Sequence, residues 1–387
     1  MATENKLHIT KEEEEEEAAA TIHGDILEAI LSHLPLIFLP PACHVSLAWH
    51  HAAFSSLGYN KIKPWLILHN QNTRKSHEAT MHAYDPRSHL WIQVMQPLAS
   101  MTYQVSTLRS STSAILYMLS PSKFSFSVDP LHLTWQHVDP PRVWRADPVV
   151  ALVGHKVVLA GGTHFFEDDA LSVEMYDTET GSWDTCDSMP DILRDSAAST
   201  WLSVAVNDNK MYVADKASGV TAWFDPITKT WRGPYDLLPE GNVYHSVIGS
   251  LNDRLILVGL IGDAEDVKSV KMWEVDTELV KLREIGEMPN SLVNRLKGES
   301  CYMTSIGVNM MGDHVYIHNP AAPHEIVVCE MVVKGMCEWG SVRNEAVNDP
   351  MCTLVFTCSD VGLADLDRAF MSEKRSFVVK YSKGMLH

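Results

Sequence analysis

The chain has 387 residues, of which 45% are hydrophobic and 21% are charged, a composition typical of folded globular domains and unlike that of a disordered chain. Its 31 basic and 49 acidic side chains give a net charge of −18, which argues against nucleic acid and membrane surfaces as partners because both need clustered Lys and Arg. No apolar run approaches the about 20 residues of a membrane-spanning helix, and seven scattered cysteines without a Cys-x-x-Cys pair indicate reduced thiols in the cytoplasm or the nucleus.

The first 20 residues carry a run of six glutamates, Glu12–Glu17, and few side chains that could form a core. Because like charges repel one another, we expect residues 1–20 to be a disordered acidic tail. The order of the segment, polar and then acidic, is the reverse of the basic and then apolar order of a signal peptide.

From Asp25 onwards the apolar residues follow the period of an amphipathic helix. Asp25 is a suitable N-cap and Pro35 a stop, and Pro40–Pro41 opens a second helical stretch. The apolar members of the two stretches are Ile26, Leu27, Ile30, Leu31 and Leu34, then Cys43, Val45, Leu47, Ala48 and Trp49. We therefore predict a small all-α domain at residues 21–57.

After Pro64 the helical period gives way to short strand-like runs bounded by Gly, Asn, Asp and Pro. A composite pattern recurs in them, with an apolar residue and an Asp followed, six positions after the Asp, by Trp or Leu. Its five copies are Tyr84-Asp85 with Trp91, Val128-Asp129 with Trp135, Tyr176-Asp177 with Trp183, Phe224-Asp225 with Trp231, and Val275-Asp276 with Leu282. The aspartates lie 44, 48, 48 and 51 positions apart, which predicts a repeat architecture.

Each copy describes a strand, a turn held by the Asp carboxylate, and a second strand whose Trp packs between adjacent sheets. With two further strands upstream, each unit supplies four strands, which is typical of a β-propeller blade. A degraded sixth copy runs from Val328 to Trp339, and the apolar run Met351–Cys358 would enter the first blade as its innermost strand. We predict a mainly β protein with six blades at residues 60–362, and a C-terminal tail at 363–387 in which Phe377–Val379 could form one further strand.

The third repeat resembles the kelch motif, with Gly161-Gly162, Tyr176-Asp177 and Trp183 in order. Residues 22–57 resemble an F-box, carried by Asp25-Ile26-Leu27-Glu28, Leu34-Pro35 and Trp49, although the usual opening Leu-Pro is here Ile22-His23. Together they resemble the plant F-box/kelch-repeat family over residues 22–362.

The family resemblance implies a substrate receptor of a Skp–cullin–F-box ubiquitin ligase, which brings its target close to the ubiquitin-loaded enzyme and needs no catalytic residue of its own. It implies docking of a Skp-family adaptor, and through it of a cullin, on Ile22, Ile26, Leu27, Ile30, Leu31, Leu34, Pro35, Val45 and Trp49. Within the family, the arrangement is most similar to the members directed at phenylpropanoid and flavonoid enzymes, such as chalcone synthase and phenylalanine ammonia-lyase.

Target recognition is expected on propeller loops, where Arg, Tyr and Trp are the usual anchors of an interface. The candidate residues are Arg74, Arg142, Trp144, Arg145, His164, Arg194, Tyr244, His245 and Arg295. The arginines among them, together with Lys75, could form a basic rim that docks an acidic surface of the target.

The motifs of common enzyme classes are missing: the sequence has no Gly-x-Ser-x-Gly, Gly-x-x-x-x-Gly-Lys or Gly-x-Gly-x-x-Gly. His77-Glu78 and His82 are one position too far apart for a helical zinc pair. We therefore predict neither a catalytic residue nor a metal or cofactor. Two alternatives remain at this point, a metal-dependent kelch enzyme of the galactose-oxidase type and a protein-interaction scaffold that takes no part in ubiquitin transfer.

Overall fold

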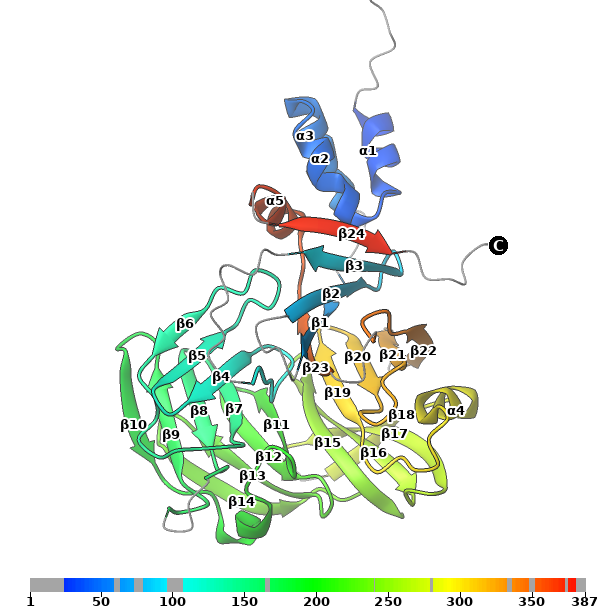
Figure 1. The fold of residues 1–387 in the computed structure, drawn as a ribbon. Helices are drawn as coiled ribbons and strands as arrows, with labels where there is room; N and C mark the ends of the chain where they lie inside the picture. The colour runs from blue at the N-terminus through cyan, green and yellow to red at the C-terminus, as the bar shows by residue number, and fades with distance from the viewer. Residues whose placement is uncertain are drawn as a thin grey trace, which may run out of the picture. The chain divides into compact units, whose positions relative to one another are not determined.

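The computed structural model describes residues 24–58, 63–72, 79–95, 107–163, 168–239, 241–278, 281–332, 336–347, 352–372 and 375–380 (Figure 1). The predicted acidic tail at residues 1–20 lies outside them. The chain forms two compact units, and both are discontinuous in sequence. One comprises the described residues within Met1–Ile62 and Gly362–Met371, and the other those within Lys63–Val361 and Ser372–His387.

The first unit, called here the helical unit, contains five helical segments. They are α1 (Asp25–Ser32), the 3-10 turn η1 (Leu36–Phe38), α2 (Leu39–Cys43), α3 (Leu47–Leu57) and α5 (Leu363–Phe370). Helix α1 packs on α3, and α2 packs on both α3 and α5. The second predicted helical stretch is thus divided in two, and Ser46 begins a new helix by accepting a hydrogen bond from the Trp49 backbone N–H (3.3 Å).

The N-cap of α1 differs from the one predicted. Gly24, with φ of 61°, occupies the cap position, and Asp25 is the first helical residue. A left-handed φ suits glycine, and a carboxylate in the first turn is favourable beside the positive end of the helix dipole.

The second unit is a six-bladed β-propeller, as the repeat predicts. Blades 3 to 6 each contain four antiparallel strands in chain order. These are β7 (Val149–Val153), β8 (Lys156–Ala160), β9 (Val173–Asp177) and β10 (Ser182–Cys186) in blade 3; β11 (Leu202–Asn207), β12 (Lys210–Asp215), β13 (Val220–Asp225) and β14 (Thr230–Asp236) in blade 4; β15 (Val243–Leu251), β16 (Arg254–Gly262), β17 (Val267–Asp276) and β18 (Lys281–Glu287) in blade 5; and β19 (Gly307–Met311), β20 (His314–His318), β21 (Glu325–Val332) and β22 (Met336–Arg343) in blade 6. Short helical segments, η3 (Asp191–Ser196) and α4 (Asn290–Lys297), precede blades 4 and 6.

The first two blades are less regular. Blade 2 holds β4 (Leu116–Ser120), β5 (Lys123–Ser127) and β6 (Gln136–Val138), and an isolated bridge between Arg109 and Tyr117 stands where a fourth strand would be. Blade 1 has five strands, in the order β23 (Cys352–Ser359), β1 (Trp65–Asn72), β2 (Ala79–Asp85), β3 (Leu90–Met95) and β24 (Ser376–Lys380).

The ring closes as the sequence predicts, through the apolar run near residue 355. Strand β23 pairs antiparallel with β1 from Trp65↔Ser359 to Asn72↔Cys352 and so supplies the inner strand of blade 1. The C-terminal strand β24 contains the run Phe377–Val379 and pairs with β3 on the other side of the blade. Both edges of β3 are thereby paired, and β24 becomes the outer strand of the blade.

In blades 1, 3 and 4 the Asp and Trp of the repeat hold the blade and join it to its neighbour. The Asp carboxylates accept backbone N–H bonds in the turn, for example from Glu179 to Asp177 (2.9 Å). The indole Nε1 of Trp183 donates to the carbonyl of Asp139 (3.0 Å), at the end of the preceding blade, and Trp231 donates in the same way to Asp187 (3.0 Å). Trp91 makes the corresponding bond to Arg343 (3.0 Å), which joins blade 1 to blade 6.

A buried apolar cluster lies at each of the six interfaces between adjacent blades. The cluster between blades 5 and 6 is large, whereas that between blades 1 and 2 centres on Leu108, Leu116, Leu133 and Val355. Since each blade has a core on both sides, the ring is stabilised around its whole circumference and can hold loops rigidly at its two faces.

Candidate functional site

The helical unit exposes large apolar side chains beside its buried core. On α1, Leu27 and Leu31 are 1% exposed, while Ile26 and Ile30 are 66% and 46% exposed. Residues four apart lie on one side of a helix, so α1 has a buried column and, next to it, an exposed apolar column. Such exposed apolar surface on a small folded unit is typical of a docking site.

Two further exposed apolar side chains lie at the start of α3. Val45 is 61% exposed and Leu47, in the first turn of α3, is 80% exposed. Because α1 packs on α3, the two helices belong to the same small assembly. We call Ile26, Ile30, Val45 and Leu47 the apolar face of the helical unit.

The residues predicted to dock an adaptor therefore differ in how exposed they are. Ile26, Ile30 and Val45 are exposed, whereas Leu27 and Leu31 are core residues and cannot reach a partner without unfolding α1. Leu34, Pro35 and Trp49 are half-buried, and Ile22 lies outside the described residues. Leu47 has the largest exposed fraction of these side chains but is not among the predicted docking residues.

The propeller contains a central cavity of about 1120 Å³. It is lined by the inner strands of the ring and by residues 107–114, which precede β4. At one mouth, Asp147 accepts hydrogen bonds from the guanidinium of Arg109 (2.9 Å) and from the backbone N–H and hydroxyl of Thr200 (3.0 and 2.6 Å). These bonds fix the loops that lead into blades 2, 3 and 4.

Lys216 lies at the same mouth and is held by backbone carbonyls. Its ammonium donates to the carbonyls of Ser199 (2.8 Å) and Thr200 (3.0 Å). Burial lowers the pKa of the Lys216 ammonium, and the carboxylates of Asp147 and Asp215 oppose that shift. The mouth is thus a polar opening with fixed donors and acceptors.

Exposed aromatic and aliphatic side chains stand on the segments that join one blade to the next. Trp201 is 59% exposed, and its carbonyl accepts the backbone N–H of Lys216 (2.9 Å), which places it beside the opening. Ile192 on η3 is 59% exposed and Tyr302, between α4 and β19, is 55% exposed. Exposed Trp and Tyr on fixed loops are typical anchors of a protein interface. We call Ile192, Trp201 and Tyr302 the loop anchors.

Three of the predicted target-binding residues instead have structural roles. Arg145 is 1% exposed, and its guanidinium donates to the carbonyls of Gly161 (2.7 Å) and Ser172 (2.9 Å) and pairs with Glu174 (3.1 Å). The hydroxyl of Tyr244 donates to the carbonyl of Met303 (2.6 Å), which fixes the loop that carries Tyr302. His245 is 9% exposed, and burial lowers its pKa to about 4.

The predicted basic rim is not assembled from the described arginines. Arg145 is inside blade 3, and Arg194, on the surface, is paired with Asp191 (2.8 Å) and Asp169 (3.5 Å). The guanidinium of Arg142 contacts the Thr185 hydroxyl and that of Arg295 contacts the Ser341 hydroxyl. Trp144 is half-buried, and Arg74, Lys75 and His164 lie outside the described residues.

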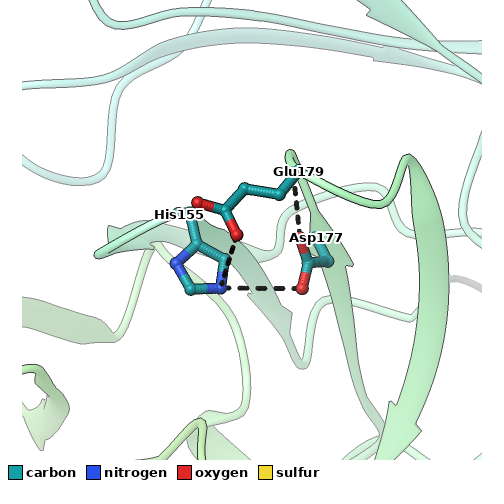
Figure 2. Close-up of side chains that lie close together, drawn as sticks. All are labelled: His155, Asp177 and Glu179. Carbon is teal, nitrogen blue, oxygen red and sulfur yellow. Dashed lines mark hydrogen bonds and ion pairs between the residues drawn. The ribbon is translucent and has the colours of Figure 1, made fainter.

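Among the described residues, two groups of side chains could offer ligands to a cation. In blade 3, Nε2 of His155 lies 3.6 Å from Asp177 and 3.9 Å from Glu179 (Figure 2). The second oxygen of Asp177 accepts the backbone N–H groups of the turn, so the carboxylate already stabilises the hairpin.

The other group lies in blade 6. Nδ1 of His314 is 2.7 Å from Asp313, and its Nε2 is 3.7 Å from Glu330. Glu330 is also paired with the ammonium of Lys63 (2.6 Å), which supplies a positive charge from the chain itself. The side chains of both groups thus already have partners of the same chain within the propeller.

None of the helices in the described part of the chain combines the length and the apolar composition needed to cross a membrane.

Comparison with known proteins gives matches to a family model, to proteins of similar sequence and to a solved structure. The Kelch motif family model matches residues 145–190, which correspond to blade 3. The chain is 45% identical over 366 residues to an F-box/kelch-repeat protein of Arabidopsis thaliana, covering 91% of this chain and 93% of that protein. A second Arabidopsis thaliana F-box/kelch-repeat protein is 29% identical over 128 residues, covering 33% and 32% of the two chains. A solved structure described as a candidate 6-phosphogluconolactonase from Bacteroides uniformis matches with a TM-score of 0.40 and 12% identity, over 77% of this chain and all of that one.

Proposed function

The chain belongs to the F-box/kelch-repeat family, and we propose that it is a substrate receptor of a Skp–cullin–F-box ubiquitin ligase. The observation that carries the proposal is the apolar face of the helical unit, joined in one chain to a propeller with exposed loop anchors. One unit would bind the Skp-family adaptor, and the other would bind the protein to be modified.

The receptor would act by proximity alone. A target held next to a ubiquitin-loaded enzyme meets it at a high effective concentration, so a tethered receptor speeds transfer without making or breaking a bond itself. The rigid closed ring supports this role because a bound target is presented in a defined orientation.

Adaptor binding is tested by charge substitution on the apolar face. Full burial of a leucine side chain contributes about 1.5–3 kcal/mol, so losing Leu47 from an interface should weaken binding by about 10- to 100-fold. We expect Leu47→Asp and Ile30→Asp to lose co-purification with the Skp adaptor. The matched control is Ile227→Asp in the propeller, because Ile227 is 80% exposed, as Leu47 is.

Three results would decide between receptor and scaffold. Loss of the adaptor in both helical-unit variants, with normal binding by Ile227→Asp, supports the receptor. Equal binding by all variants would show that the apolar face is not the docking site. A wild-type chain that fails to retain any Skp adaptor would overturn the receptor proposal and favour an interaction scaffold.

For the target, we propose a phenylpropanoid or flavonoid enzyme, with chalcone synthase and phenylalanine ammonia-lyase as the first two to test. The support is the family membership and the exposed Trp201 and Tyr302, which fit recognition of a folded protein surface better than that of a small molecule. We expect the half-life of the target enzyme to fall when the receptor is overexpressed and to recover with proteasome inhibition.

The Trp201→Ala variant should lengthen that half-life while leaving adaptor binding intact, because Trp201 is in the propeller. Met336→Ala is the control, since Met336 is 64% exposed but lies on β22 at the outer edge of blade 6. An unchanged half-life of both enzymes at every receptor level would reject these targets and leave the adaptor test standing.

A further inference from the structure

The C-terminal helix α5 is part of the helical unit, although more than 300 positions separate it from α3. Along the sequence, α5 follows β23 and precedes β24, which are the first and last strands in the order of blade 1. The helix nevertheless packs on α2 and on η1 of the helical unit (Figure 1). An F-box read from residues 21–57 alone therefore omits one of the helices of the folded unit.

The sequence of α5 specifies a stable, one-sided helix. The Asp365 carboxylate accepts the backbone N–H of Gly362 (3.0 Å) and so caps the first turn, and it also pairs with Arg368 (2.8 Å). Leu363, Leu366 and Ala369 are 2%, 0% and 0% exposed. Their spacing of three places them along one face of the helix, which is the face that is buried.

Helix α2 needs such a neighbour. It has five residues, two of them prolines, which is too short to be stable by its own hydrogen bonds. The residues Gly24–Gly58 also fall below the about 40 residues at which a chain usually forms a core without help. The apolar face of α5 supplies the missing buried surface.

A polar contact fixes the end of α2 against α5. Nε2 of His44, which immediately follows α2, hydrogen-bonds to the carboxylate of Asp367 (2.7 Å). Val45 and Leu47, two members of the apolar face, follow within three residues. The position of α5 therefore influences the positions of the Val45 and Leu47 side chains.

We propose that α5 is a positioning element of the adaptor-docking surface, which holds α2 and thereby the start of α3 in the conformation that the adaptor binds. The inference rests on the proposed adaptor function. It differs from that proposal because it assigns a requirement to residues 362–371, which follow every described strand of the propeller except β24 and lie outside the segment that resembles an F-box.

The test uses the full chain with single substitutions on α5. Leu366→Asp places a carboxylate in the buried face, and Ala364→Asp is the matched control because Ala364 lies on the same helix but is exposed. We expect Leu366→Asp to weaken adaptor binding at least tenfold and Ala364→Asp to leave it within twofold. The milder Leu366→Ala should give an intermediate loss, which guards against misfolding of the more drastic variant.

Hydrogen exchange provides a readout that does not need the adaptor. In Leu366→Asp the amides of α2 and of the first turn of α3 should exchange faster, while those of the inner propeller strands stay protected. Unchanged exchange in α2 would overturn the inference whatever the adaptor does. So would adaptor binding equal to that of the wild-type chain. If the wild-type chain does not bind the adaptor at all while Leu366→Asp still loosens α2, the proposed function fails and the structural role of α5 stands.

Discussion

Acid should unfold the propeller at a pH at which many folded domains are still stable, because the folded propeller buries several histidines in their neutral form. Burial lowers the pKa of His69 and of His318 to about 3. It lowers the pKa of His82 and of His245 to about 4, with Lys380 and Lys216 adding to the shift. Both ring nitrogens of His82 are buried without a hydrogen-bond partner among the described residues.

The direction of the effect follows from proton binding. Below about pH 6.5 the unfolded chain protonates these four histidines, whereas the folded chain does not until about pH 4 or lower. Stability is therefore complete above pH 6.5 and falls as the pH is lowered from there. For each histidine that stays unprotonated in the folded chain, the free energy of unfolding falls by about 1.4 kcal/mol per pH unit. The four together therefore lower it by about 5 kcal/mol per pH unit at most. A domain stable by about 5–15 kcal/mol would then unfold between about pH 4 and pH 5.5.

The assay is urea unfolding followed by tryptophan fluorescence at half-unit steps from pH 7.5 to pH 4.5. His82→Leu should flatten the slope of stability against pH by about a quarter, because one of four proton-binding sites is removed from the unfolded chain. The control is His155→Leu, whose side chain is 46% exposed. A wild-type stability that stays constant down to pH 5, or a slope unaltered by His82→Leu, would refute the reasoning.

Three further predictions concern the structure of the ring. Trp231→Phe keeps an aromatic ring but removes the N–H that bonds Asp187, and should lower the free energy of unfolding by about 1 kcal/mol in urea titration; an unchanged value would show that the bond between blades contributes nothing. Glu174→Gln leaves buried Arg145 without its counter-charge and should lower the free energy of unfolding by about 3–5 kcal/mol. The control Glu179→Gln, at an exposed position, should cause no measurable change, and equal melting temperatures of the two variants would contradict this prediction. A chain ending before β23 should lose its cooperative melting transition and elute as an expanded species, and a compact monomer with normal melting would show that closure through β23 is dispensable.

The repeat made the propeller predictable from sequence. An Asp that caps a turn recurs at nearly constant spacing, and in blades 1, 3 and 4 it is followed by a Trp that bonds the adjacent blade, since these blades meet the same kind of neighbour. Ring closure was predictable for a related reason, because the first unit has three strands and an apolar run remained near the C-terminus. Blade 2 kept the spacing but not the geometry: β5 ends at Ser127 and β6 begins only at Gln136, after Trp135.

The roles of single apolar residues were less predictable. In α1 the stripe is wide enough for two columns, and periodicity does not say which column faces the core. Leu27 and Leu31 occupy the buried column, so two of the four docking residues expected on α1 are structural. Residue type misled in the loops as well. Arg145 has the chemistry of an interface anchor but is buried against Glu174, whereas Trp201, which is not among the predicted target-binding residues, is 59% exposed. Its position outside the repeat register was the available signal.

Helix α5 shows why sequence order hides the organisation of this chain. Its stripe of Leu363, Leu366 and Ala369 is readable, but nothing local reveals that its partner is an N-terminal helix of five residues. Strand β23, which closes the ring, and α5, which completes the helical unit, follow one another directly. Neither unit therefore has all its elements until the last part of the chain is present. A chain that ends early loses the inner strand of blade 1 and the support of α2 together, so integrity of the ring and of the proposed adaptor surface depend on the same C-terminal segment.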